Sequence, residues 1–133
     1  MRVFIDVNLL MYSAGAHHLY KEPSIQLLRR VANGQLNAVI DTEILQELLY
    51  RYWHLKILDQ GIVLMNYAVQ AIPTILPVAK FDLLLGATLL TQYHLIEPRD
   101  AIHAAVMLNH GITQIYSYDR HFDSITGIRR MEP

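Results

Sequence analysis

Cysteine is absent from the 133-residue sequence. Its absence excludes disulfide bonds, zinc sites built on thiolates and cysteine nucleophiles. Charged residues are also scarce, at 17% of the chain against about 25% in a typical soluble domain. The formal net charge of -1 gives no global positive field that would attract nucleic acid. Any binding of phosphate must therefore depend on a local cluster of charges or on bound cations.

The sequence has no apolar run long enough to cross a bilayer. The longest later stretch, residues 83–90, falls far short of the ~20 residues of a membrane-spanning helix. Near the N-terminus, Asp6 and Asn8 interrupt the apolar residues before they reach the ~7 to 15 residues of an export signal. Together with the lack of cysteine, these features predict a soluble, cytoplasmic protein that has no membrane partner.

The chain length fits one domain, because a single core typically occupies roughly 100 to 200 residues. No internal repeat, linker or low-complexity segment divides the sequence. We therefore expect a single domain over residues 1–133. Hydrophobic residues make up 53% of the chain, and we expect some of this surplus to face a partner.

Short apolar runs alternate with segments of helical periodicity along the chain. Because parallel neighbouring strands need long crossover connections, this alternation predicts an α/β fold with three layers, in which helices cover both faces of a central, mostly parallel sheet of four to five strands. The prolines at 73 and 77 favour an edge position for the third strand. Strands are expected at residues 3–5, 36–40, 73–78, 113–116 and 128–131, and helices at residues 9–13, 23–33, 42–52, 59–71, 80–93 and 98–109.

Four acidic residues lie where strands end or where the following helices begin. Asp6 ends the first strand, and Glu47 lies in the second turn after the second strand. Asp100 lies in the first turn of the last helix, and Asp119 follows the fourth strand. In open α/β sheets such positions meet in a crevice beyond the carboxyl ends of the strands. Four carboxylates gathered there repel one another unless cations lie between them, which favours one or two Mg²⁺ or Mn²⁺ ions.

Four segments carry a resemblance to a known family. They are FIDVNLLMY, DTEILQELLY, PRDAIHAAVMLNHG and IYSYDRHFD, and their order and spacing over almost the whole chain resemble the PIN-domain family, in particular the VapC toxins of toxin–antitoxin pairs. The resemblance implies a PIN-like fold and an acidic site that is both catalytic and metal-binding. It implies that this site consists of Asp6, Glu47, Asp100 and Asp119, supported by Asn8 and Ser117.

The sequence departs from the family pattern at two positions. Ser117 stands where the family more often has threonine, which keeps the hydroxyl group. His121 stands where a further acid is common, and Asp123 is a candidate to compensate for that acid. His121 is itself a supporting candidate that could touch the scissile phosphate or the metal shell.

The resemblance also implies a function. It implies a metal-dependent endoribonuclease that cleaves single-stranded or loop RNA and leaves a 5′-phosphate and a 3′-hydroxyl. It further implies a homodimer and a cognate antitoxin that inserts a peptide segment near the active site. Two alternatives within the family are an RNA-processing nuclease outside a toxin system and a non-catalytic module that binds RNA or a partner protein.

Each candidate residue also has a structural explanation. Asp6 can cap a helix, Glu47 can form an exposed ion pair with Arg51, and Asp100 suits the positive end of a helix. The seven histidines show no zinc-ligand spacing, so most are expected at the surface or at helix ends. The aromatic residues at 50, 52 and 53 could stack on bases, although packing or an interface is the favoured interpretation.

Two other phosphoryl-transfer classes fit the sequence less well. A haloacid-dehalogenase type of enzyme needs a second aspartate two residues after Asp6, where this chain has Asn8. A receiver domain needs a lysine after a late strand, where this chain has Ser117 and Tyr118. Detection of a phosphoryl group covalently bound to Asp6 would support either of these two classes.

Overall fold

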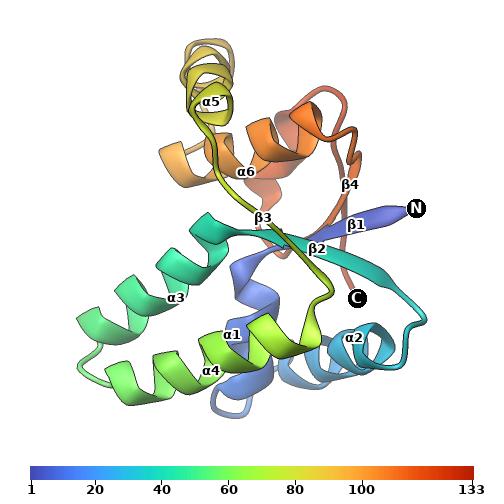
Figure 1. The fold of residues 1–133 in the computed structure, drawn as a ribbon, viewed down its shortest axis with the longest axis vertical. Coiled ribbons are helices and arrows are strands. Elements are labelled where there is room, and N and C mark those ends of the chain that lie inside the picture. The colour runs from blue at the N-terminus through green and yellow to red at the C-terminus, as the bar shows by residue number, and fades with distance from the viewer.

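A five-stranded sheet forms the centre of the molecule in a computed structural model that describes residues 1–133 (Figure 1). The strand order is β3-β2-β1-β4-β5, and all four neighbouring pairs are parallel. The sheet is thus wholly parallel, where the sequence predicted a mostly parallel one. The strands are β1 (Arg2–Ile5), β2 (Asn37–Asp41), β3 (Thr74–Leu76), β4 (Gln114–Tyr116) and β5 (Arg129–Met131).

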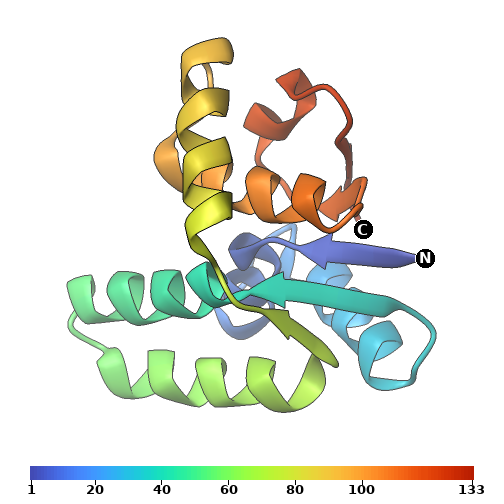
Figure 2. The ribbon, with the colours of Figure 1, turned by 45° about the horizontal axis from the view of Figure 1, so that its top comes forward.

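Helices cover both sides of this sheet, which confirms the predicted three-layer α/β/α architecture. Figures 1 and 2 show α5 and α6 on one side and α1 to α4 on the other. The helices are α1 (Val7–Ala14), α2 (Lys21–Ala32), α3 (Thr42–His54), α4 (Leu58–Ala71), α5 (Lys80–Gln92) and α6 (Pro98–Asn109), followed by a short 3₁₀ helix, η1 (Arg120–Ser124). No helix in the structure combines the length and the apolar character that crossing a bilayer would need.

The central strands are apolar because both of their faces are covered by helices. In β1, residues 3–5 are buried, and in β2, residues 38–40 are fully buried. Such uninterrupted apolar runs are typical of parallel strands that lie between two layers of helices. The strand between Pro73 and Pro77 lies at the edge of the sheet, as predicted, since proline has no backbone N–H to donate to a further strand.

The start of α2 differs from the prediction. The helix begins at Lys21, two residues before Pro23, where the sequence predicted that the proline opens it. Proline is tolerated there because the N–H groups of the first turn have no partner inside the helix. The predicted end at Asn33 and Gly34 is confirmed, and Gly34 adopts the left-handed conformation (φ 72°) that commonly ends a helix.

The order of the strands places a crevice beside β1. After β1 the chain builds β2 and β3 on one side, and it then crosses to build β4 and β5 on the other side. Ligands in open α/β sheets bind where the strand order reverses in this way, beyond the carboxyl ends of the strands. Asp6 follows β1 and Ser117 follows β4, so the topology brings these two residues to the same point.

Candidate metal and catalytic site

Asp6 joins the end of β1 to the start of α1. One carboxylate oxygen, Oδ1, accepts a hydrogen bond from the backbone N–H of Val7 at 2.8 Å. The other, Oδ2, accepts from the hydroxyl of Ser117 at 2.6 Å and from the amide of Asn8 at 3.3 Å. Asp6 is only 5% exposed. The capping interpretation is therefore correct, and the same hydrogen bonds fix the carboxylate at the crevice.

Ser117 and Asn8 connect the ends of β1 and β4. The Ser117 hydroxyl donates to Asp6 and accepts hydrogen bonds from the backbone N–H of Asp119 at 2.9 Å and from the Asn8 amide at 3.3 Å. The Asn8 side-chain oxygen in turn accepts from the backbone N–H of Tyr118 at 3.4 Å. This network holds the backbone of Asp119 close to the Asp6 carboxylate.

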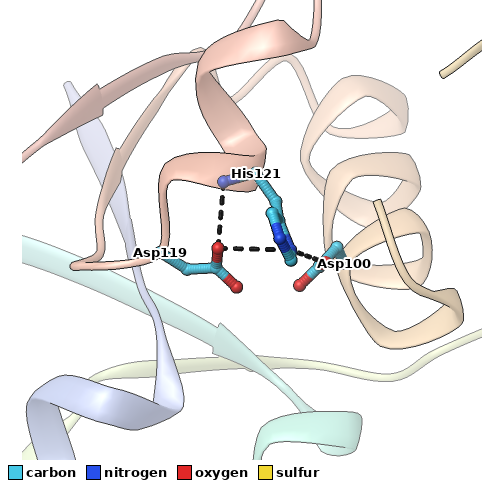
Figure 3. A group of neighbouring side chains, drawn as sticks. All are labelled: Asp100, Asp119 and His121. Carbon is cyan, nitrogen blue, oxygen red and sulfur yellow. Dashed lines mark hydrogen bonds and ion pairs between the residues drawn. The ribbon is translucent and has the colours of Figure 1, made fainter. Parts of the chain in front are cut away.

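Asp100, Asp119 and His121 point toward one another, although Asp100 belongs to α6, Asp119 immediately precedes η1 and His121 belongs to η1 (Figure 3). His121 Nδ1 lies 3.2 Å from Asp100 Oδ2 and 3.3 Å from Asp119 Oδ1. Potential ligand atoms of all three residues lie within 4.8 Å of one another. Each carboxylate also caps its own helix, since Asp100 Oδ2 accepts from the N–H of Glu97 and Asp119 Oδ1 accepts from the N–H of His121.

Glu47 reaches the same cleft from α3. Its carboxylate lies 3.3 Å from two nitrogens of Arg51, but Glu47 is buried while Arg51 is exposed. An exposed helical ion pair is therefore the wrong description of this contact. The cleft has a volume of about 110 Å³ and is lined by Asp6, Val7, Asn8, Met11, Glu47, Arg51, Glu97, Arg99, Asp100, His103 and Asp119. All four predicted acids thus face one cavity.

The comparisons with known proteins agree with this arrangement. A family model for the PIN domain matches residues 3–128. The chain belongs to the PIN-domain family. The chain is also 34% identical over 129 residues, 97% of its length, to a VapC ribonuclease of Mycobacterium bovis and to ribonuclease VapC13 of Mycobacterium tuberculosis, and the match covers 98% of each.

Solved structures of PIN-domain toxins share the fold. VapBC2 of Rickettsia felis, bound to a DNA fragment from its promoter, gives a TM-score of 0.78 at 15% identity over 99% of this chain and 98% of that one. VapC20 of Mycobacterium tuberculosis, described as a Sarcin-Ricin loop cleaving toxin, gives the same score and identity over 98% of this chain and 99% of that one. At this identity the likeness is evidence for the fold, and it confirms the predicted PIN-like architecture.

His103 is the main residue of the PIN domain's cleft that the sequence reasoning missed. Most of the histidines were expected at the surface or at helix ends, yet His103 is 1% exposed. Its Nδ1 lies 2.8 Å from Asp41 Oδ2, and its Nε2 lies 3.5 Å from Glu47 Oε1. The signal was present in the sequence, because His103 lies one turn after Asp100 on the helix face that carries Ala104 and Met107, and such a face packs inward.

Asp123 does not lie with the acids of the PIN domain's cleft. Its side chain is exposed, and its Oδ1 accepts a hydrogen bond from Arg130 Nε at 2.8 Å. Arg130 also donates from Nη1 to the backbone oxygen of Ser117 at 2.9 Å. The structure therefore connects Asp123 to the site only through Arg130 and the backbone that follows β4.

Burial and mutual repulsion change the proton affinities of the acids in the cleft. Burial raises the pKa of Asp6 to about 6; the charges of His103 and the hydroxyl of Ser117 oppose this rise, and Glu47 adds to it. Burial also raises the pKa of Asp100, and the Asp119 carboxylate adds to the increase. Burial alone would raise the pKa of Glu47, but His103 and Arg51 outweigh it and the pKa is lowered.

The ligand atoms suit a hard divalent cation. The Oδ1 atom of Asp100 and the Oδ2 atom of Asp119 accept no hydrogen bond within the protein, so both keep lone pairs for a ligand. A site rich in carboxylate oxygens that lacks thiolates is the kind that Mg²⁺ and Mn²⁺ prefer. A bound cation would also relieve the repulsion that raises the pKa of Asp100.

Proposed function

We propose that this PIN domain is a metal-dependent endoribonuclease that cleaves single-stranded or loop RNA, and that it is the toxin of a VapBC-type toxin–antitoxin pair acting in the cytoplasm. The observation that carries the proposal is that Asp6, Glu47, Asp100 and Asp119 line one cleft. The names of the relatives support an RNA substrate, since both curated proteins are called ribonucleases and one structural neighbour cleaves the sarcin–ricin loop.

The four acids would hold one or two Mg²⁺ or Mn²⁺ ions. When bound, such a cation lowers the pKa of a water molecule and offsets the negative charge of the phosphate. Ser117 and Asn8 orient Asp6, while Arg51 and His103 orient Glu47. We assign His121 a supporting role, since it contacts both Asp100 and Asp119.

The surroundings of Asp6 argue against a covalent phospho-aspartate. Both oxygens of its carboxylate accept hydrogen bonds, from Val7 and from Ser117 and Asn8, and the residue is almost fully buried. A nucleophilic carboxylate must approach phosphorus along an open path. Water is therefore the nucleophile in the proposed hydrolysis.

Incubation of the protein with a panel of unstructured and stem-loop RNAs is expected to give cleavage in Mg²⁺ or Mn²⁺ and none after chelation. The products are expected to carry a 5′-phosphate and a 3′-hydroxyl, because water attacks the phosphorus and the 3′ oxygen leaves. End-group analysis of the fragments is the measurement. A 2′,3′-cyclic phosphate would contradict hydrolysis of this kind, and metal-independent binding without cleavage would favour the non-catalytic alternative.

Two protein partners follow from the proposed toxin role. The resemblance implied an antitoxin segment near the active site, and we propose that another part of the antitoxin binds an apolar groove of about 560 Å³ that is separate from the acidic cleft. The groove is lined by Ser13, Ala14, Ile25, Leu28, Arg29, Tyr52, Gln60, Val63, Leu64 and Tyr67. The exposed side chains of Phe81, Leu83 and Leu84 on α5 favour a second copy of the chain.

The dimer is tested by light scattering after size-exclusion chromatography. The protein is expected to elute at twice its 15.3 kDa mass. The substitution Leu84→Glu is expected to shift it toward the monomer, because a charge buried at an apolar interface is costly. A monomeric wild-type protein at micromolar concentration would contradict the assignment of this face to a homodimer.

A further inference from the structure

A second pocket adjoins the acidic cleft. It has a volume of about 360 Å³ and is lined by Met11, Tyr50, Arg51, His54, Leu55 and Arg99. We call it the Tyr50 pocket. Met11, Arg51 and Arg99 line both this pocket and the acidic cleft, so the two cavities are direct neighbours. A polymer whose phosphate lies at the acids can therefore extend into the Tyr50 pocket.

One wall of the pocket is aromatic. Tyr50 is 44% exposed, so its ring is not used by the core. His54 lies one helical turn later on α3, and its ring is nearly parallel to that of Tyr50, with an interplanar angle of 16°. Exposed aromatic rings of this kind are the surfaces on which unpaired bases stack. Tyr52, by contrast, is buried, so the structure separates the aromatic residues that the sequence grouped together.

Two of the residues that line the pocket carry guanidinium groups with unused hydrogen-bond donors. Arg99 approaches Glu43 at 3.7 Å and Glu47 at 3.9 Å, but its guanidinium makes no hydrogen bond within the protein. It lies over the Tyr50 ring, 5.0 Å from the centroid. Arg51 is exposed and uses Nε and Nη2 on Glu47, which leaves Nη1 free. Both arginines lie beside carboxylates, but their unused N–H donors can bind a phosphate next to the acidic cleft.

We propose that the Tyr50 pocket binds the nucleotide next to the scissile phosphate of a single-stranded RNA. The base stacks on Tyr50, and the phosphate of that nucleotide accepts hydrogen bonds from Arg51 and Arg99. The volume lies within the roughly 300 to 1,000 Å³ of small-ligand pockets. Because every base has a π-face, this subsite holds the strand without strong preference for one base. The inference rests on the proposed ribonuclease function and names the part of the substrate that this pocket takes.

The direct test measures the binding of fluorescein-labelled oligo(U) and oligo(A) of about eight nucleotides by fluorescence anisotropy in Mg²⁺. All proteins in this test carry Asp100→Asn, so that the RNA is not cleaved during the measurement. Adding Tyr50→Ala is expected to weaken binding about tenfold, whereas Tyr50→Phe keeps the ring and the affinity. Adding Arg99→Ala is expected to lower the slope of log affinity against log salt by about 0.7, because one phosphate contact is lost. Val69→Ala, at an exposed position on α4 that lines neither the Tyr50 pocket nor the acidic cleft, is the control and leaves binding unchanged.

A second experiment measures KM and kcat for RNA cleavage by proteins that keep Asp100. Tyr50→Ala is expected to raise KM about tenfold with little change in kcat, and an abasic site at the nucleotide beside the cut is expected to cost the same factor. The effects of Tyr50→Ala and of the abasic site are not additive, because each change removes the same stacking contact between Tyr50 and the base. Unchanged affinity and KM for Tyr50→Ala in a protein that cleaves RNA would overturn the subsite and leave the pocket to a protein segment. If the protein with Asp100 intact cleaves no RNA but Tyr50→Ala still weakens RNA binding, the ribonuclease proposal fails while the RNA subsite stands.

Discussion

Replacement of Asp6 by asparagine is expected to reduce RNA cleavage at least about a thousandfold without weakening the metal-free fold. The substitution removes a proposed metal ligand, which would supply several kcal/mol of transition-state stabilisation. Each ~1.36 kcal/mol corresponds to a factor of ten in rate. The rate is measured as single-turnover cleavage of a stem-loop RNA in Mg²⁺. The matched control is Asp123→Asn, since Asp123 lies outside the acidic cleft and pairs with Arg130, and it is expected to keep most of the activity.

The stability of the metal-free Asp6→Asn variant follows from the sign of the pKa shift. The pKa of Asp6 rises from 3.8 to about 6 on folding, so the group favours the folded state below pH 3.8 and this contribution is lost as the pH rises through 6. At pH 7.5 the wild-type protein therefore carries a cost of about 3 kcal/mol. Asparagine removes this cost but loses part of a hydrogen-bond network worth about 1 to 1.5 kcal/mol.

Urea unfolding in EDTA is the matching measurement. The free energy of unfolding of Asp6→Asn at pH 7.5 is expected to equal that of the wild-type protein or to exceed it by up to about 2 kcal/mol, and any excess shrinks between pH 6 and pH 4. A loss of several kcal/mol at pH 7.5 would mean that Asp6 is mainly a structural cap. In that case the loss of cleavage would have no bearing on metal binding.

Replacement of His103 by leucine is expected to lower the free energy of unfolding by about 3 to 5 kcal/mol, because it leaves Asp41 and Glu47 buried without their shared partner. Burial alone would lower the pKa of His103, but the charge and hydrogen bond of Asp41, together with Glu47, raise it well above 6.5. The imidazolium therefore stabilises the fold fully below about pH 6.5, and this contribution is lost as the pH rises through the raised pKa.

Chemical denaturation at two pH values, one near 6 and one as alkaline as the protein tolerates, measures this effect. The difference between the wild-type protein and His103→Leu is expected to be larger at the lower pH. His94→Ala is the control, because His94 is exposed and changes at such positions usually stay within about 0.5 kcal/mol. A double variant that adds Asp41→Leu is expected to lose less than the sum of the two single variants, since both remove one ion pair. Additive losses would contradict the proposed pairing.

The helices, the strands and the meeting of the four acids at one cleft could largely be predicted from the sequence, because the signals for them are local. Short apolar runs such as residues 3–5 and 38–40 are typical of buried parallel strands, and side chains that follow such strands lie near the crevice of an α/β fold. The prolines beside β3 predicted an edge strand, and this signal is also local, because the missing backbone N–H belongs to the proline itself.

Contacts between side chains that are far apart in the sequence could not be predicted from the sequence. The Asp41 and His103 pair spans 62 positions, and neither residue shows from its neighbours that it meets the other. Arg130 follows Arg129 in the sequence, and two adjacent basic residues give no sign of burial, yet the Arg130 side chain is 11% exposed and donates to the backbone oxygen of Ser117. Asp123 was a candidate for the acidic site because it lies two residues after His121, but its side chain points to Arg130 instead of the cleft.

Manganese binding by the metal-free protein, measured by isothermal titration calorimetry at pH 7.5, tests most directly whether the four gathered carboxylates form a cation site. The wild-type protein and Asp123→Asn are expected to bind Mn²⁺ with equal affinity, while Asp6→Asn, Asp100→Asn and Asp119→Asn each bind it at least about tenfold more weakly. Equal affinity in all five proteins, or no binding by the wild-type protein, would contradict the account.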